Sequence, residues 1–327
     1  MNSTGSFIDF VLKLENYLRP ICTLVGIIAV LDNLLIIVIL FYNRKQWNQI
    51  DVFVLTLSFV DCTYALALII NLVAMLINDS WILGDILCRA LLSVDMFTMS
   101  CSIYILLIMS IVRYQVVKQP LNSLVLVDPL QKAFILIITQ FVLALLVATP
   151  MMIFTQTKEE ESRTICTSGW PKDWFKNYLV GIFILNYLLP SLILCVIHRK
   201  FIRKISMSLE SRRQLQISTS DSSVNSNQRR MNIMVYVIVL SFLICYFPFW
   251  FLQFKMNYFG GTPVYDRLFL TIAMTLTYFN ACANPFIYTL LSKRYNAFFT
   301  KRIWRRSDSQ SIALRSTVNN QVVSQLS

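Results

Sequence analysis

Four residues that could take part in chemistry lie in one apolar stretch, residues 88–114. Cys88 opens it, and Asp95, Ser102 and Arg113 follow. In an α-helix, about two turns separate Cys88 from Asp95 and Asp95 from Ser102, and about five separate Asp95 from Arg113. All four therefore lie nearly on one face, with the two charges about 27 Å apart along the axis, close to the thickness of a bilayer core. Such a helix suits the centre of a bundle better than contact with lipid.

Two carboxylates within apolar stretches are candidate binding groups, and each has two readings. Asp61 would lie at mid-bilayer, either as a hydrogen-bonding node inside the bundle or as a cation site. Asp95 lies near the expected outer end of its span. It either pairs internally with Lys255 or Arg267, or awaits the cation of a ligand.

Composition places these residues in a membrane protein. The chain has 327 residues, 56% hydrophobic and 14% charged, and its apolar residues come in long runs, which is typical of membrane proteins. A single histidine, with neither a Gly-rich phosphate loop nor a metal-ligand cluster, argues against an enzyme, a cofactor or a metal centre. Seven stretches are long enough to span a bilayer: 20–42, 51–77, 86–114, 131–154, 177–199, 231–254 and 266–291.

The basic residues predict the orientation. Most of the 29 Lys and Arg fall in alternate connections and in the C-terminal segment, which places the N-terminus outside by the positive-inside rule. The charge is scattered between spans, so nucleic-acid binding explains it poorly. Cys88 and Cys166 then lie on the oxidising side, where a disulfide is their natural pairing. Asn2 and Asn78 stand in sequons on the same side, so both are candidate glycosylation sites.

Four regions follow along the chain. Residues 1–19 are expected to form a short extracellular tail, and residues 20–291 the seven-span bundle. Residues 292–306 mix aromatic and basic side chains, which predicts an amphipathic helix on the inner membrane surface. Residues 307–327 are polar and predicted to be a disordered cytoplasmic tail.

Prolines and polar residues mark the later spans. Pro190 should distort the fifth span locally. Pro248 lies among aromatic residues, where its kink is either static packing or a hinge with two states. The seventh span contains Asn284-Pro285 and no lysine that could hold retinal. We find no paired repeat halves, which argues against a transporter.

Taken together, these residues resemble the rhodopsin-like (class A) G-protein-coupled receptors over essentially the whole chain. The resemblance implies an all-α fold, a seven-transmembrane helix bundle with a short amphipathic helix after the seventh span. The matching residues follow the family's order: Asn33, Leu57 to Asp61, Cys88 with Cys166, Arg113-Tyr114, Pro190, Phe242 with Cys245 and Pro248, and Asn284-Pro285-x-x-Tyr288. Residues 93–103, Cys166-x-x-x-Trp170-Pro171 and Asn280–Pro285 are similar to the somatostatin and opioid peptide receptors in particular.

This resemblance implies three groups of functional residues. The residues expected to bind the peptide are Asp95, which would pair with a basic group, Met99, Trp170 and Tyr278. The residues expected to form a polar pocket for an allosteric sodium ion are Asn33, Asp61, Ser102, Asn280 and Asn284. The residues expected to contact the G protein or to move on activation are Arg113, Tyr114, Tyr246, Pro248 and Tyr288.

The implied partners are an extracellular peptide, a heterotrimeric G protein of the Gi/o class, arrestin through a phosphorylated tail, and plasma-membrane lipid. Several departures qualify the resemblance. Val112 replaces the acid that normally precedes Arg113, and His198 replaces a tyrosine at the end of the fifth span. Gln140 and Tyr246 stand where tryptophans are usual, and Asp32 where a glycine is usual. We therefore expect a peptide receptor with raised basal activity. The alternative is a scavenger, decoy or orphan receptor with impaired G-protein coupling.

Overall fold

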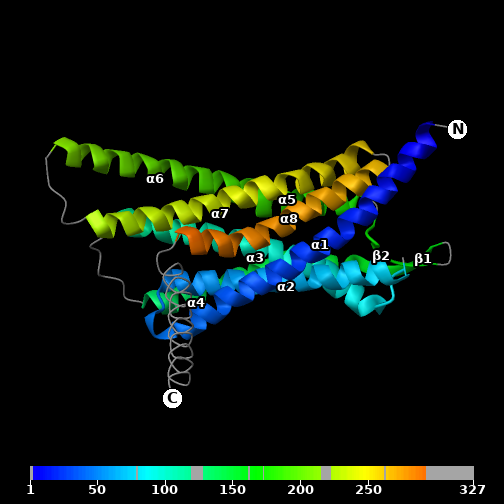
Figure 1. Cartoon of the computed structure of the whole chain (residues 1–327), viewed down its shortest axis with the longest axis horizontal. Coiled ribbons are helices and arrows are strands. Elements are labelled where there is room, and N and C mark those ends of the chain that lie inside the picture. Colours follow the sequence, from blue (N-terminus) through cyan, green and yellow to red (C-terminus); the bar gives the residue numbers. More distant parts are fainter. Residues whose placement is uncertain are drawn as a thin grey trace, which may run out of the picture.

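The computed structural model describes residues 3–78, 80–118, 128–160, 163–171, 173–214, 222–260 and 263–291. Figure 1 shows long helices lying along a common axis, with a small hairpin at one end. The α-helices are α1 (Ser3–Tyr42), α2 (Gln49–Asn78), α3 (Gly84–Lys118), α4 (Pro129–Phe154), α5 (Trp174–Phe183), α6 (Leu189–Gln214), α7 (Ser222–Phe254) and α8 (Pro263–Leu291). The shorter elements are the 3-10 turn η1 (Arg44–Gln46), the π-helical turns η2 (Ile184–Leu188) and η3 (Lys255–Phe259), and the strands β1 (Thr155–Glu160) and β2 (Arg163–Ser168).

These elements make seven membrane-length rods, because η2 joins α5 to α6 and η3 extends α7. The predicted seven-helix bundle is therefore confirmed. Within the described residues, six rods are long and apolar enough to cross a membrane. The seventh, α8, does not reach that standard of apolarity, since it carries Asp266, Asn280 and Asn284 among its apolar residues.

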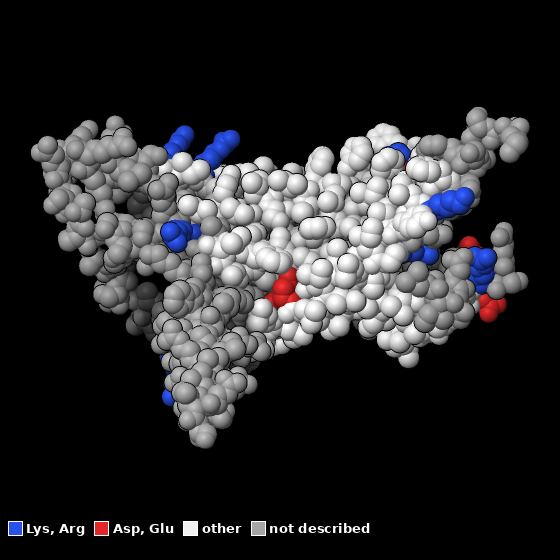
Figure 2. Space-filling view, in the orientation of Figure 1, with Lys and Arg blue, Asp and Glu red and all other residues white. Residues whose placement is uncertain are grey.

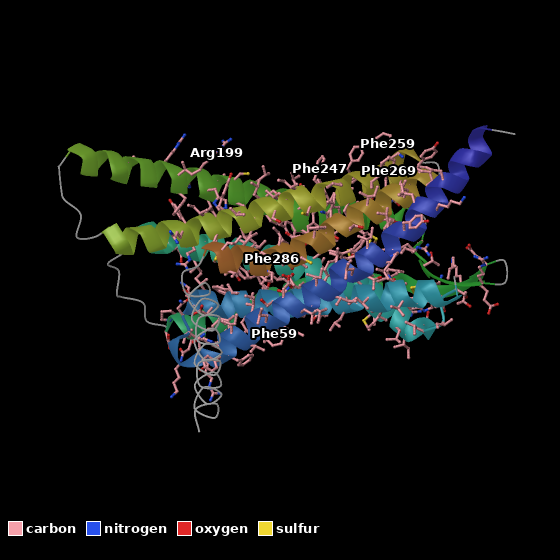
Figure 3. All side chains as sticks on the ribbon, viewed as in Figure 1. Phe59, Arg199, Phe247, Phe259, Phe269 and Phe286 are labelled. Carbon is pink, nitrogen blue, oxygen red and sulfur yellow. A yellow bond between two sulfur atoms is a disulfide. The ribbon has the colours of Figure 1, made fainter. Side chains whose placement is uncertain are left out.

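The outside of the bundle is apolar. Phe59, Phe247 and Phe286 are 48%, 58% and 56% exposed, and Figure 3 shows them pointing away from the helices. One face is free of Lys and Arg through its middle, with a single acidic patch there (Figure 2). So much exposed apolar surface is expected where lipid replaces water.

The observed boundaries differ from the predicted ones in two places. α1 begins at Ser3 and runs through Pro20, so much of the predicted tail 1–19 is helical. Residues 222–228, which precede the predicted sixth span 231–254 and are rich in Ser and Asn, form the first two turns of α7. Both differences arise because a helix can continue past the apolar segment, whose ends mark the membrane rather than the secondary structure. The predicted amphipathic helix 292–306 and the tail 307–327 lie outside the described residues, as does Asn2.

A hairpin that the sequence did not predict covers one end of the bundle. β1 and β2 pair antiparallel, with Thr157 opposite Cys166, and the predicted disulfide joins Cys166 to Cys88 on α3. The backbone N–H of Thr157 donates to the Asp85 carboxylate at 2.9 Å, which also ties the hairpin to α3. We call this end, with residues 155–168, the hairpin end, and the other end of α3 the Arg113 end.

α3 forms the centre of the bundle. Cys101, Ile103 and Ile105 are completely buried in the main apolar core, which also contains Phe242 of α7. α3 packs against α2, α4, α6 and α7. The position expected from its polar face is therefore confirmed.

The fifth rod is distorted where Pro190 predicted. A proline lacks the N–H that would bond four residues back, toward Asn186, and η2 lies directly before it. The widened turn places Asn186 in the interior, where it accepts a hydrogen bond from Tyr104 at 2.9 Å and donates to Ser100 at 2.7 Å. These contacts fix the rod against α3.

Candidate functional site

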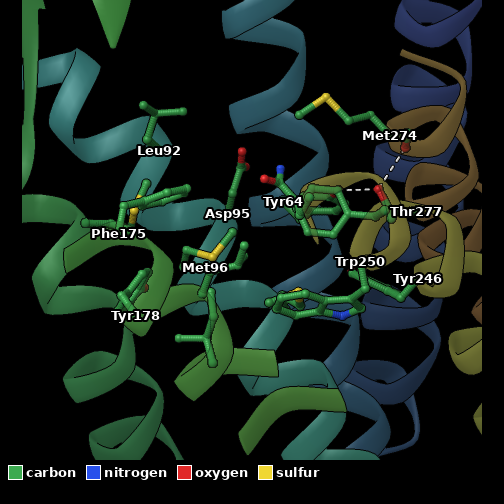
Figure 4. Close-up of a pocket in the computed structure, with 16 residues that line it drawn as sticks. Tyr64, Leu92, Asp95, Met96, Phe175, Tyr178, Tyr246, Trp250, Met274 and Thr277 are labelled. Carbon is green, nitrogen blue, oxygen red and sulfur yellow. Dashed lines mark hydrogen bonds between the residues drawn. The ribbon is translucent and has the colours of Figure 1, made fainter. Parts of the chain in front are cut away.

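A cavity of about 140 Å³ lies among the helices toward the hairpin end, walled by α2, α3, α4, α5, α7 and α8. In Figure 4, Asp95 lies between Phe175 and Tyr178 on one side and Tyr64 on the other, with Trp250 below it. The lining is otherwise mainly aromatic and aliphatic. Such a site holds an apolar group and directs one polar contact through Asp95.

Asp95 is half-buried and is the only charged side chain in the described lining. Its carboxylate makes no hydrogen bond or ion pair within the described part of the chain. Lys255 instead binds Asp266 at 2.5 Å, which excludes the internal pairing with Lys255; the side chain of Arg267 lies outside the described residues. A half-buried carboxylate without a counter-charge favours an incoming cation.

The predicted ligand-binding residues are only partly brought together. Met99 lines the cavity with Asp95, whereas Tyr278 does not. Tyr278 is buried behind Tyr64, with ring centroids 5.2 Å apart. Tyr64 in turn shares a 2.7 Å hydrogen bond with Thr277 across α2 and α8. Tyr278 therefore supports the wall without forming it.

Trp170 also lies apart from the cavity lining. It follows β2 and stacks on Tyr178, with ring centroids 4.8 Å apart, and on Phe154, at 4.5 Å. Its indole Nε1 is buried without a hydrogen-bond partner among the described residues. Trp170 therefore holds the hairpin against α4 and α5.

Two aromatic residues of α7 close the cavity floor. Tyr246, predicted to move on activation, stacks on Phe242 with centroids 4.3 Å apart. Trp250, which the sequence reading missed, is 1% exposed and contacts Phe183 at 5.4 Å. Residues four apart lie on the same face of a helix. Because Tyr246 was expected to face inward, the sequence could have predicted that Trp250 does so too. Pro248 lies between them within α7.

A polar core occupies the middle of the bundle. Asn284 donates to the Asp61 carboxylate at 2.8 Å, and Asn33 donates to the Ala281 carbonyl at 3.0 Å. The side-chain oxygens of Asn33 and Asn284 are buried and lack partners within the described residues. Carboxylate and carboxamide oxygens are the ligand type that hard cations prefer.

The other expected members of the polar pocket make different contacts. Asn280 accepts a hydrogen bond from Ser241 of α7 at 3.1 Å. Ser102 is buried on α3 and makes no hydrogen bond to Asp61 in the described structure. Asp32, half-buried on α1, accepts a hydrogen bond from Asn33 at 3.3 Å. No three His, Cys, Asp or Glu side chains of the described chain gather as metal ligands.

Three of the predicted switch residues, Arg113, Tyr114 and Tyr288, lie at the Arg113 end. Val112 is 6% exposed and belongs to the apolar core. The Arg113 Nε is buried without a hydrogen-bond partner in the described structure. Asp51, in the first turn of α2, is 4% exposed and accepts a hydrogen bond from the Asn48 backbone N–H at 2.8 Å. Tyr288 is fully buried and Tyr114 half-buried.

Comparison with known proteins agrees with this arrangement. The family model described as 7 transmembrane receptor (rhodopsin family) matches residues 32–288. The urotensin-2 receptor of Bos taurus is 28% identical over 294 residues, covering 89% of this chain and 74% of the relative. The somatostatin receptor type 2 of Sus scrofa is 28% identical over 305 residues, covering 91% and 79%. The resemblance to somatostatin receptors is therefore confirmed, and similarity to urotensin-2 receptors is added to it.

Proposed function

This chain belongs to the rhodopsin family of seven-transmembrane receptors, and on that premise we propose that it is a receptor for a basic peptide that activates heterotrimeric G proteins. Its relatives are receptors rather than enzymes, and two are named for urotensin-2 and somatostatin. We propose a ligand of the somatostatin, opioid or allatostatin-C kind, coupling to Gi/o. The hairpin end would face outward from the plasma membrane.

The observation that carries the proposal is the half-buried Asp95, which has no hydrogen-bond or ion-pair partner in the described structure. A Lys or Arg side chain of a peptide would pair with it inside an apolar cavity. Glu159 and Glu160 are exposed on the hairpin above, and their charge would steer a basic peptide toward the opening.

The test is Asp95→Asn, which keeps the side chain's shape and removes its charge. Truncating one partner of a buried charge pair costs about 2–5 kcal/mol, which corresponds to a loss of roughly 30- to several-thousand-fold in potency. The assay is G-protein activation by Lys- or Arg-bearing peptides at matched surface expression. Glu160→Gln is the control, since an exposed rim charge should shift potency only a few-fold. Unchanged potency in Asp95→Asn would remove Asp95 as the anchor.

We further propose that basal signalling is raised. In the closed bundle, an acid at position 112 would hold Arg113, and Val112 cannot do so. Arg113, Tyr114 and Tyr288 would contact the G protein or move when the Arg113 end opens.

A receptor-derived scavenger or decoy is the second candidate. The observation that favours it is that Val112 and His198 replace the acid and the tyrosine that are usual at these two positions. Intact surface binding of peptide together with a flat second-messenger response, with and without ligand, would support this candidate over the first.

We also propose a sodium ion as an allosteric effector of the polar core. The residues that would hold it are Asn33, Asp61, Ser102, Asn280 and Asn284. Raising NaCl at constant ionic strength, with choline chloride as the balance, should weaken agonist affinity. Asp61→Asn should abolish that dependence, and an equal sodium effect in the variant would exclude this site.

A further inference from the structure

A groove of about 670 Å³ runs along the outside of the bundle between α3, α4 and the rod formed by α5, η2 and α6. Its edges are apolar and open to the surroundings of the bundle; Leu146 and Leu189 are 64% and 47% exposed. On α4 it extends from Leu136 to Pro150, which is about 21 Å along a helix axis. Its length and position suit a chain-like molecule that enters from the bilayer.

One polar group in this groove lacks a partner. Gln140 lines the groove and is 2% exposed. Both its Nε2 and its Oε1 are buried without a hydrogen bond to any described residue. The neighbouring polar side chains are satisfied, since Tyr178 donates to the Val147 carbonyl at 2.9 Å and Thr139 to the Ile135 carbonyl at 2.9 Å.

An unpaired carboxamide is costly where water is absent. Gln140 lies about 16 Å along α4 from Pro129 and about 21 Å from Phe154, so it lies near mid-bilayer. A ligand that both donates and accepts a hydrogen bond there would recover the lost interactions. The ligand must be uncharged, because a charge at this depth is strongly disfavoured.

We propose that this groove binds a long-chain primary amide of the fatty acid amide class. Neither polar atom of Gln140 is accessible in this structure, so its side chain must first turn into the groove that it lines. A primary amide then pairs with its carboxamide through two antiparallel N–H···O hydrogen bonds and satisfies its donor and its acceptor together. The hydrocarbon chain lies along the apolar groove toward Pro150. This site shares Tyr178 and Ile182 with the wall of the peptide cavity, but it opens to the outside of the bundle and does not depend on the peptide proposal.

The groove also offers a steric test. Gly181 lines it, and a Cβ added there meets no heavy atom within 4 Å. Gly181→Leu would therefore place its Cβ without a clash and extend its side chain into the groove, and it replaces a weak helix former with a strong one. The variant should fold and lose the space for the chain.

The experiment is saturation binding of radiolabelled oleamide to the full-length receptor in phospholipid nanodiscs, with empty nanodiscs subtracted. We expect saturable binding, weakened roughly tenfold or more in Gln140→Leu, since two neutral hydrogen bonds are lost, and abolished in Gly181→Leu. N,N-dimethyloleamide, which cannot donate, should compete at least several-fold more weakly. Thr149→Leu is the control, because Thr149 is exposed on α4 outside the groove lining.

Two results would overturn the proposal. The first is oleamide uptake that is only non-saturable, or that is equal in all four proteins. The second is a lower thermal midpoint of ligand-free Gln140→Leu. Replacing an unpartnered buried amide with an apolar side chain should leave the midpoint unchanged or raise it, so a fall would show an internal partner. Ser58, whose buried hydroxyl also lacks a partner in the described structure, is the candidate to examine then.

Discussion

Restoring an acid beside Arg113 is the sharpest test of how this bundle is held closed. In Val112→Asp the new carboxylate would lie next to a guanidinium whose Nε has no hydrogen bond in the described structure. A hydrogen bond to a charged group is worth about 1.5–3 kcal/mol. Desolvation of an acid at a 6% exposed position offsets part of this.

We therefore expect a net stabilisation of the closed state of about 1–2 kcal/mol, and so a fall of roughly 5- to 30-fold in ligand-independent signalling. The assay is basal nucleotide exchange on a Gi/o protein, normalised to surface receptor. Val112→Asn is the matched control, since it brings similar shape and polarity without the charge.

Asp51→Asn provides the reciprocal perturbation. If the charge of Asp51 holds Arg113 from α2, its removal should raise basal exchange in the wild-type background. The rise should be smaller in Val112→Asp, because Arg113 then has a nearer acid. Equal basal exchange in Val112→Asp and Val112→Asn at equal expression would refute the electrostatic account.

Three further predictions concern stability. Cys166→Ser removes a disulfide between residues separated by 78 positions and should lower the free energy of unfolding by about 4 kcal/mol. The thermal midpoint should fall and no longer respond to reductant, and an unchanged midpoint would contradict this. Asn284→Ala takes away the hydrogen bond to Asp61 and should lower the free energy of unfolding by about 1–3 kcal/mol, measured by thermal inactivation. Thr289→Ala, at a half-buried position of α8, is the control and should have little effect. Trp250→Ala removes the indole from the cavity floor and should lower the free energy of unfolding by about 3–5 kcal/mol. Trp250→Phe should have a smaller effect. Similar thermal midpoints for the two variants would show instead that neighbouring side chains repack into the space.

The sequence was enough to predict the bundle because lipid imposes simple rules on it. Apolar length defines a span, and polar residues within a span must face inward. These rules predicted the central position of α3 and the interior placement of Asp61. The distortion at Pro190 was predictable for an equally local reason, the missing backbone donor.

What could not be predicted depends on packing between segments distant in the chain. The β1–β2 hairpin lies between the predicted spans 131–154 and 177–199, where the sequence predicted no strand. Tyr278 was assigned to the ligand site, but Tyr64 of α2 lies between it and the cavity. The burial of Asp51 at the start of α2 arises only when the helices pack together.

Asp32 has a consequence for how the protein is made. An ionised acid at the centre of an isolated helix costs about 2.5–3.5 kcal/mol on insertion, and α1 enters the bilayer before α2 and α8 have been synthesised. The adjacent Asn33 donates to the Ala29 carbonyl within α1, but it reaches the Ala281 carbonyl on α8 only across 248 residues of chain. Until then the apolar residues of Tyr17–Tyr42, the most apolar of the six spans, must hold α1 in place. The contact between the first and last helices therefore forms only after the whole bundle has been synthesised.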